Sequence, residues 1–135
     1  MLIRPIISRL NESTLFKTVR FARELPELSK FRPEELPAVY MLPTSSRGGD
    51  EGGDLYLQQE NVEVYSFCLI TEAPDPNGTD EPLGDALEEL RSLLFGLQIS
   101  PSFSPLALGE GDLIDFNNRV NAWIETFVTK RTFRT

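Results

Sequence analysis

The chain has 135 residues, of which 40% are hydrophobic and 25% are charged, and its net charge is −8. This composition is typical of one globular domain and excludes a disordered chain. No apolar run approaches the roughly 20 residues of a membrane span, and Arg9 interrupts the apolar opening segment, which argues against a signal peptide.

The first third of the chain contains one helix, one segment of open type and one strand. Apolar residues at helical spacing predict a short amphipathic helix over residues 3–12. Residues 15–25 combine a helical apolar spacing with a run of strand-forming side chains, so the sequence leaves their type open. Prolines make residues 26–36 a turn or one short helical piece. Residues 37–43 read as a strand with proline at both ends, where it least disturbs a ladder.

Residues 44–54 contain four glycines and three acidic groups, and none of them could anchor a hydrophobic core. A small domain seldom devotes this much chain to a connection unless the connection itself makes contacts. We therefore predict a flexible loop over residues 44–54 that becomes ordered when a partner binds.

The middle of the chain carries the strongest strand and helix signals. Residues 55–72 alternate, and both of their faces become apolar after Tyr65, which predicts a central strand covered on both sides. A broad apolar stripe from Leu83 to Leu97 predicts a second helix that packs on the core. Asp80 is the expected N-cap of this helix.

The last part of the chain returns to strand patterns. Gly109–Asp112 is expected to be a hairpin turn between residues 106–108 and 113–116, and strict alternation predicts a final strand of about ten residues beginning at Val120. The elements together predict a single small α+β domain over residues 1–135. Its sheet is largely antiparallel or mixed and is flanked by two main helices.

Charge is distributed unevenly along the chain. Residues 1–32 have seven basic groups against three acids (net +4), and residues 33–128 have three against 18 (net −15). Residues 129–135 form a basic C-terminal tail with three basic groups and no acid. Two explanations are open for this pattern. The charged residues could simply be scattered over a solvated surface, or the basic end of one copy could bind the acidic body of the next by electrostatic attraction. Nucleic acid is a poor partner for so acidic a body, because neutralisation of phosphates drives that binding.

The sequence supports no catalytic, cofactor or metal site. It has no histidine, the commonest general base and metal ligand. Cys68 lies in the middle of a strand among apolar residues, which favours a packed core thiol over a nucleophile. As the single cysteine it allows no internal disulfide, which suits the cytoplasm. The acids of residues 50–54 and 75–80 are better explained as a solvated loop and a capped turn than as calcium ligands.

Six short sequence segments follow one another along nearly the whole chain: Ile6–Leu10, Phe16–Val19, Leu36–Pro43, Val62–Ile70, Gly84–Arg91 and Trp123–Lys130. Their succession around the polar loop resembles the layout of the tail terminator proteins of long-tailed, lambda-type phages and prophages. The serine- and proline-rich segment Ser100–Pro105 departs from that layout.

The resemblance implies a subunit of a homo-hexameric ring that caps the completed tail tube, stops its polymerisation and provides the head-joining surface. The implied partners are other copies of the chain, the tail tube protein and head–tail connector proteins. DNA would pass through the ring without being specifically bound, and no membrane is involved. The resemblance also implies binding in place of catalysis, and a place in the virion tail after assembly in the host cytoplasm.

Charged residues of the two basic ends and of the polar loop are the predicted interface: Arg4, Arg9, Arg47, Asp50, Glu51, Asp54, Lys130, Arg131 and Arg134. Two alternatives stay open at this point. The first is another head–tail connector or tail-completion protein, and the second is a small cytoplasmic ligand-binding or enzymatic α/β domain. Ring assembly would favour the tail terminator or the connector, whereas a deep pocket with convergent polar groups would favour the ligand-binding or enzymatic domain.

Overall fold

The computed structural model describes residues 3–23, 27, 30–42, 45–51, 58–74, 81–117 and 119–134. Their elements are α1 (Arg4–Leu10), β1 (Thr18–Phe21), the 3-10 turn η2 (Pro33–Glu35), β2 (Ala38–Met41), β3 (Ser45–Glu51), β4 (Gln58–Glu72), α2 (Pro82–Leu94), β5 (Ala107–Phe116) and β6 (Val120–Arg134). The fold is a small α+β domain with a mixed sheet and two α-helices, as predicted.

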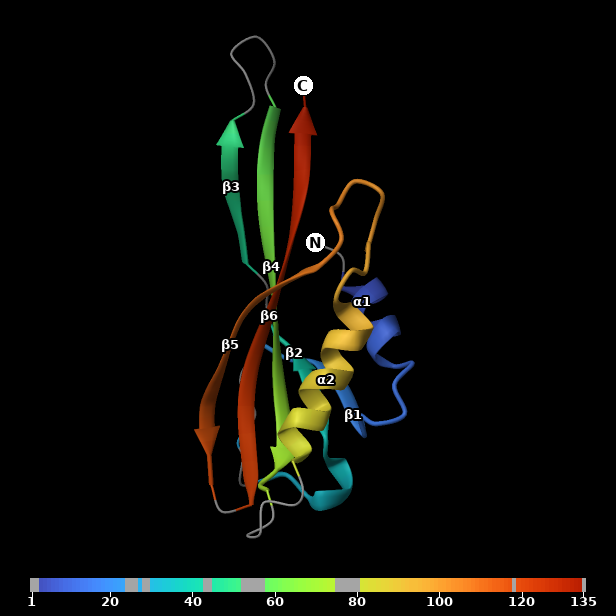
Figure 1. Cartoon of the computed structure of the whole chain (residues 1–135), viewed down its shortest axis with the longest axis vertical. Coiled ribbons are helices and arrows are strands. Elements are labelled where there is room, and N and C mark those ends of the chain that lie inside the picture. The colour runs from blue at the N-terminus through green and yellow to red at the C-terminus, as the bar shows by residue number, and fades with distance from the viewer. Residues whose placement is uncertain are drawn as a thin grey trace.

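The sheet is organised around the pairing of β4 with β6. These two antiparallel strands pair over their full length, from Gln58 opposite Arg134 to Glu72 opposite Val120. The strand order is β1-β2-β4-β6-β5, in which β1 is parallel to β2 and the other pairs are antiparallel. Because β2 and β3 occupy successive stretches of the same edge of β4, one part of the sheet has five strands and the other has three. Figure 1 shows the two parts one above the other.

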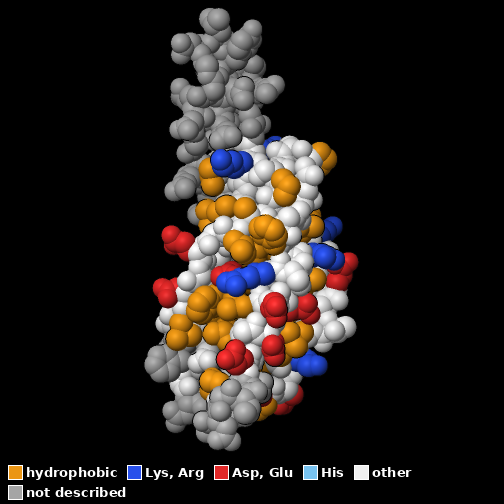
Figure 2. All heavy atoms as spheres, viewed as in Figure 1, with side chains coloured by type: hydrophobic (Ala, Val, Ile, Leu, Met, Phe, Trp, Pro, Cys, Tyr) orange, Lys and Arg blue, Asp and Glu red, His pale blue; other side chains and the backbone are white. Residues whose placement is uncertain are grey.

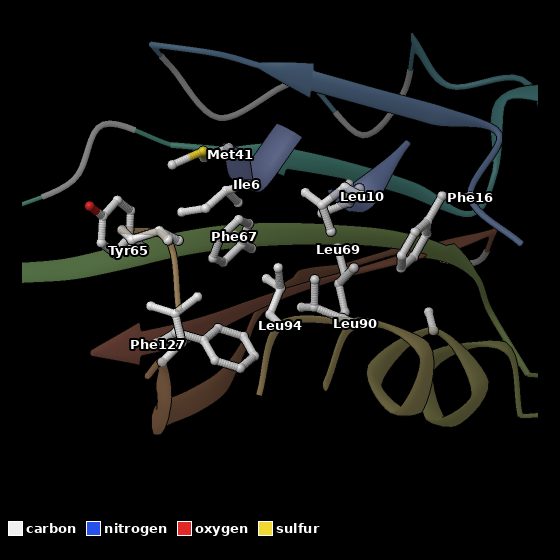
Figure 3. Close-up of a cluster of buried hydrophobic side chains, with 14 of the residues drawn as sticks. Ile6, Leu10, Phe16, Met41, Tyr65, Phe67, Leu69, Leu90, Leu94 and Phe127 are labelled. Carbon is white, nitrogen blue, oxygen red and sulfur yellow. The ribbon is translucent and has the colours of Figure 1, made fainter. Parts of the chain in front are cut away.

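The main hydrophobic core lies between the sheet and the two helices (Figure 3). Ile6 and Leu10 of α1 and Leu90 and Leu94 of α2 are fully buried against the sheet. Phe67 of β4 packs edge-on against Phe127 of β6, with ring centres 5.8 Å apart. Since each fully buried side chain of this kind stabilises the fold by about 1.5–3 kcal/mol, this layer holds the helices on the sheet.

A second cluster covers the opposite face of the sheet. Phe31 and Leu36, which flank the η2 turn, pack there against Cys68 and Ile70 of β4. β4 is therefore covered on both faces in its second half, which confirms the prediction of a central strand that is apolar on both sides after Tyr65. Within residues 15–25, whose type the sequence left open, the structure has the strand β1.

The predicted loop is wrong over Ser45–Glu51, which forms the strand β3 along β4. A ladder is made of backbone hydrogen bonds, so a glycine-rich segment without apolar side chains can still pair with an open strand edge. Residues 44 and 52–54 of the predicted loop lie outside the described part of the chain. The basic C-terminal tail is also part of the sheet, because residues 129–134 continue β6 and pair with β4.

The predicted hairpin turn at Gly109–Asp112 is also wrong, because β5 runs through it without reversing. The pairing with β6 shifts register between Leu108 and Gly111, which is a bulge. The glycines are needed for close approach, not for a turn: a Cβ atom at Gly111 would overlap the carboxylate of Glu125. At the start of α2 the N-cap position is Glu81 instead of the predicted Asp80, which lies outside the described residues.

Replacement of Gly111 by alanine should lower the free energy of unfolding by about 1–3 kcal/mol. The new Cβ would meet the Glu125 carboxylate and lie 2.9 Å from Cζ2 of Trp123. Gly84→Ala is the matched control, because its Cβ would meet the flexible side chain of Glu81 at 3.3 Å. Alanine also suits a helix better than glycine by about 0.5–1 kcal/mol. Urea unfolding of the two variants measures the difference, and equal losses of stability would contradict the close approach at Gly111.

The Cys68 thiol should be inert in the folded protein. Burial in the second cluster raises its pKa to about 12, so the thiol stays protonated at pH 8, and the thiolate is the reactive species. We expect no reaction with Ellman's reagent in buffer at pH 8 and one thiol per chain in 6 M guanidinium chloride. Labelling of the folded protein at the rate of a free thiol would contradict the packing described here.

Candidate assembly interface

The three-stranded part of the sheet forms an extension that we call the arm. It consists of β3, the first part of β4 (Gln58–Val64) and the last part of β6 (Val128–Arg134). The remainder of the domain, with both helices, is called the body. Figure 1 shows the arm strands continuing past α1 and α2. Among residues 61–64, the part of Gln58–Val64 whose side chains the structure describes, none belongs to either hydrophobic cluster.

The arm brings together six of the nine residues that the sequence predicts for the interface: Arg47, Asp50, Glu51, Lys130, Arg131 and Arg134. Arg47 of β3 is opposite Val62 of β4, and Val62 is in turn opposite Lys130 of β6. Two basic residues that are far apart in sequence therefore occupy one row across the three strands. Asp54 lies outside the described residues.

The segment Ser100–Pro105 is bound along β6 at the base of the arm. The backbone N–H of Ser104 donates to the carbonyl of Lys130 at 2.8 Å, and the Lys130 N–H donates to Ser104 Oγ at 2.9 Å. The Arg131 guanidinium lies 5.3 Å from the centre of the Phe103 ring, in a cation–π contact. As a result Arg131 is half-buried, whereas the side chain of Lys130 is exposed.

The structure separates the two arginines of α1 from the arm. Arg9 donates from Nε to the carbonyl of Leu93 at 3.0 Å and forms an ion pair with Glu12. These contacts join α1 to the end of α2, so Arg9 has a role inside the subunit. Arg4 is exposed in the first turn of α1.

Two glutamates are buried in the sheet, and the sequence analysis missed both. The Tyr65 hydroxyl donates to Glu63 at 2.6 Å where the arm joins the body. Glu125 is 2% exposed; it accepts from Nε of Arg91 on α2 and, at 3.2 Å, from Nε1 of Trp123. Burying a carboxylate is tolerated when it is paired and hydrogen-bonded. An acidic residue inside an alternating apolar face is the signal that points to such a pair.

The described residues contain no cluster of three or more acids, cysteines or histidines that could hold a metal ion. A hollow of about 210 Å³ between the body's loops and α2 is lined in part by Leu15, Glu72 and Asp85. It is smaller than the roughly 300–1,000 Å³ of typical small-molecule pockets. Among the described helices, none has the length and apolar character needed to cross a membrane.

Comparison with known proteins identifies the family. The fold is similar to that of a chain in a solved structure titled "Virion of native gene transfer agent (GTA) particle", with a TM-score of 0.59 and 14% sequence identity over 95% of this chain and 92% of that chain. No curated protein matches the sequence significantly. A sequence model of the family described as phage tail terminator protein matches residues 1–135, the whole chain. The chain therefore belongs to the phage tail terminator family, as the order of its short sequence segments indicated.

Proposed function

We propose that this chain is the subunit of a homo-hexameric ring that caps the completed tail tube. The ring stops tube polymerisation and provides the surface to which the head is joined. The observation that carries the proposal is the family match over the full length of the chain. The tail tube protein and head–tail connector proteins are accordingly its partners, and assembly takes place in the host cytoplasm before the ring becomes part of the virion tail.

The proposed activity is binding, and the arm has the properties of a binding element. A small extension of three strands gains stability when another surface packs on it, so contact with a neighbouring protein in the assembled tail would stabilise the arm. The arm concentrates charged residues at the end of the molecule away from the helices (Figure 1). We assign these residues to protein contacts in the assembled tail end.

The body supplies an acidic surface, which is complementary to the basic residues of the arm. Glu81, Asp85 and Glu88 are exposed at the start of α2 and along its outer side, and Figure 2 shows acidic side chains gathered in this region. Six copies at −8 each would sum to about −48. A ring with that charge would let DNA pass through its opening without specific binding.

The proposal predicts that the chain limits tube length. Purified tube protein polymerised with the chain should give short, uniform tubes, because an occupied tube end cannot add another tube ring. Without the chain, the tubes should continue to grow. Electron microscopy of the two reactions gives the length distributions. Identical distributions at equimolar chain and tube ends would contradict the capping function.

Reversing one exposed charge on the arm should weaken assembly and leave the fold intact. Lys130→Glu should raise the concentration needed for assembly several-fold, because it places like charges in a contact between complementary surfaces. The free energy of unfolding should change by less than about 0.5 kcal/mol, as is usual for an exposed site.

Lys30→Glu is the matched control for Lys130→Glu. Lys30 is an exposed lysine of the body whose ammonium lies 3.5 Å from Glu27, so the charge change is the same at a different place. Sedimentation velocity of the variants at low and high salt measures assembly, and salt should reduce the difference between Lys130→Glu and wild type. Equal behaviour of the two variants would show that Lys130 is not in the interface.

A further inference from the structure

The two outer strands of the body, β1 and β5, differ in chemistry. Among the described strands, β1 pairs only with β2 and β5 pairs only with β6, so each presents an open backbone edge. They lie on opposite sides of the body in Figure 1. Open edges of this kind are templates for pairing with another chain.

The two edges carry opposite charge. Residues 17–23 contain three basic residues and no acid, whereas residues 107–116 contain three acids and no basic residue. Lys17, Arg20 and Arg23 are exposed on the first edge. Glu110 and Asp112 are exposed on the second. Protection against unwanted pairing would explain charge on each edge, but it would not require opposite signs.

The complementarity extends to the two faces of the sheet. Arg20 is opposite Tyr40, and Asp112 is opposite Ile124. Both Tyr40 and Ile124 pack on the second cluster, on the face away from the helices. Directly opposite residues share a face of a sheet, so Arg20 and Asp112 project from the same face at the two edges. Neither forms an ion pair with another charge in the described part of the chain.

Each of the two edges also has an exposed apolar side chain on the helix-covered face of the sheet. Val19 packs on the main cluster, and Phe21 follows two positions later on the same face, 42% exposed. On β5, Leu113 is opposite Trp123, which also packs on the main cluster, and Leu113 is 42% exposed. Figure 2 shows hydrophobic side chains gathered at the lower left, where Figure 1 places β5. Each edge therefore offers an apolar side chain on one face and a charge on the other.

We propose that β1 of one copy lies along β5 of the next copy and that this contact closes the ring. The inference rests on the proposed hexamer and names the surfaces that form it. Contact between two different patches is head-to-tail, which is the geometry that generates closed rings. Within one sheet β1 runs opposite to β5, and rotation about a ring axis preserves each strand's direction along that axis. The two edges therefore meet as an antiparallel pair. With Phe21 directly opposite Leu113, Asp112 is the diagonal neighbour of Arg20 on the same face, within reach of the long arginine side chain.

Mixing of two charge-reversal variants tests this pairing. Arg20→Glu alone would place two carboxylates against each other at every contact, and Asp112→Lys alone would place an ammonium against a guanidinium. Each single variant should raise the midpoint concentration of hexamer formation about tenfold. An equimolar mixture can alternate around a ring of six, so that each contact joins either the two wild-type charges or the two reversed ones. Native mass spectrometry should therefore show hexamers with three copies of each variant near the wild-type midpoint.

Glu34→Lys is the matched control, because Glu34 is exposed on the η2 turn and belongs to neither edge. It should assemble like wild type, and mixing it with Arg20→Glu should not restore full assembly. Thermal unfolding of each variant checks that the subunit is folded. If wild type forms rings but the single variants assemble unchanged, the edge pairing is wrong and the capping function stays intact. The same holds if wild type forms rings but the mixture shows no rescue. Absence of wild-type rings, both free and on tube ends, would overturn the two proposals together.

Discussion

Fifteen consecutive residue pairs join β4 to β6, and the other elements take their places from this pairing. A strand of 15 residues is about 50 Å long, whereas the 13-residue helix α2 covers about 20 Å. The helices can therefore cover only part of the sheet. The part that the helices cover is the body, with a hydrophobic cluster on each face. The length of the β4–β6 pair carries the arm strands past the helices (Figure 1).

The ion pair between the exposed Arg91 and the buried Glu125 fixes α2 over the body. Because Glu125 lies on the helix-covered face of β6, its carboxylate needs space above the adjoining strand, and Gly111 of β5 leaves that space. The same stretch of β5 contains the register shifts. One polar contact in the core therefore influences the shape of an outer edge, where the acidic residues of the proposed ring contact are exposed.

Periodicity predicted those elements whose side chains enter the core. α1, α2, β2, β4 and β6 were all anticipated, because apolar residues recur on their buried faces at the helix or strand period. β3 could not be predicted in this way, since its sequence is rich in glycine and charge and it is a strand through its backbone pairing with β4. Gly109 and Gly111 suggested a turn, but they are small because β6 side chains lie against them. The charged residues of the proposed interface were named from sequence, whereas the position of six of them on the arm depends on the pairing of β3 and β6 with β4.

An electron microscopic reconstruction of the head-proximal end of a completed tail would show whether the chain forms a ring on the end of the tail tube. We expect a closed ring of six copies on the last ring of tube protein, in which β5 of each subunit lies beside β1 of its neighbour. A tail end without this chain, or with the chain bound as a monomer at its side, would contradict this expectation.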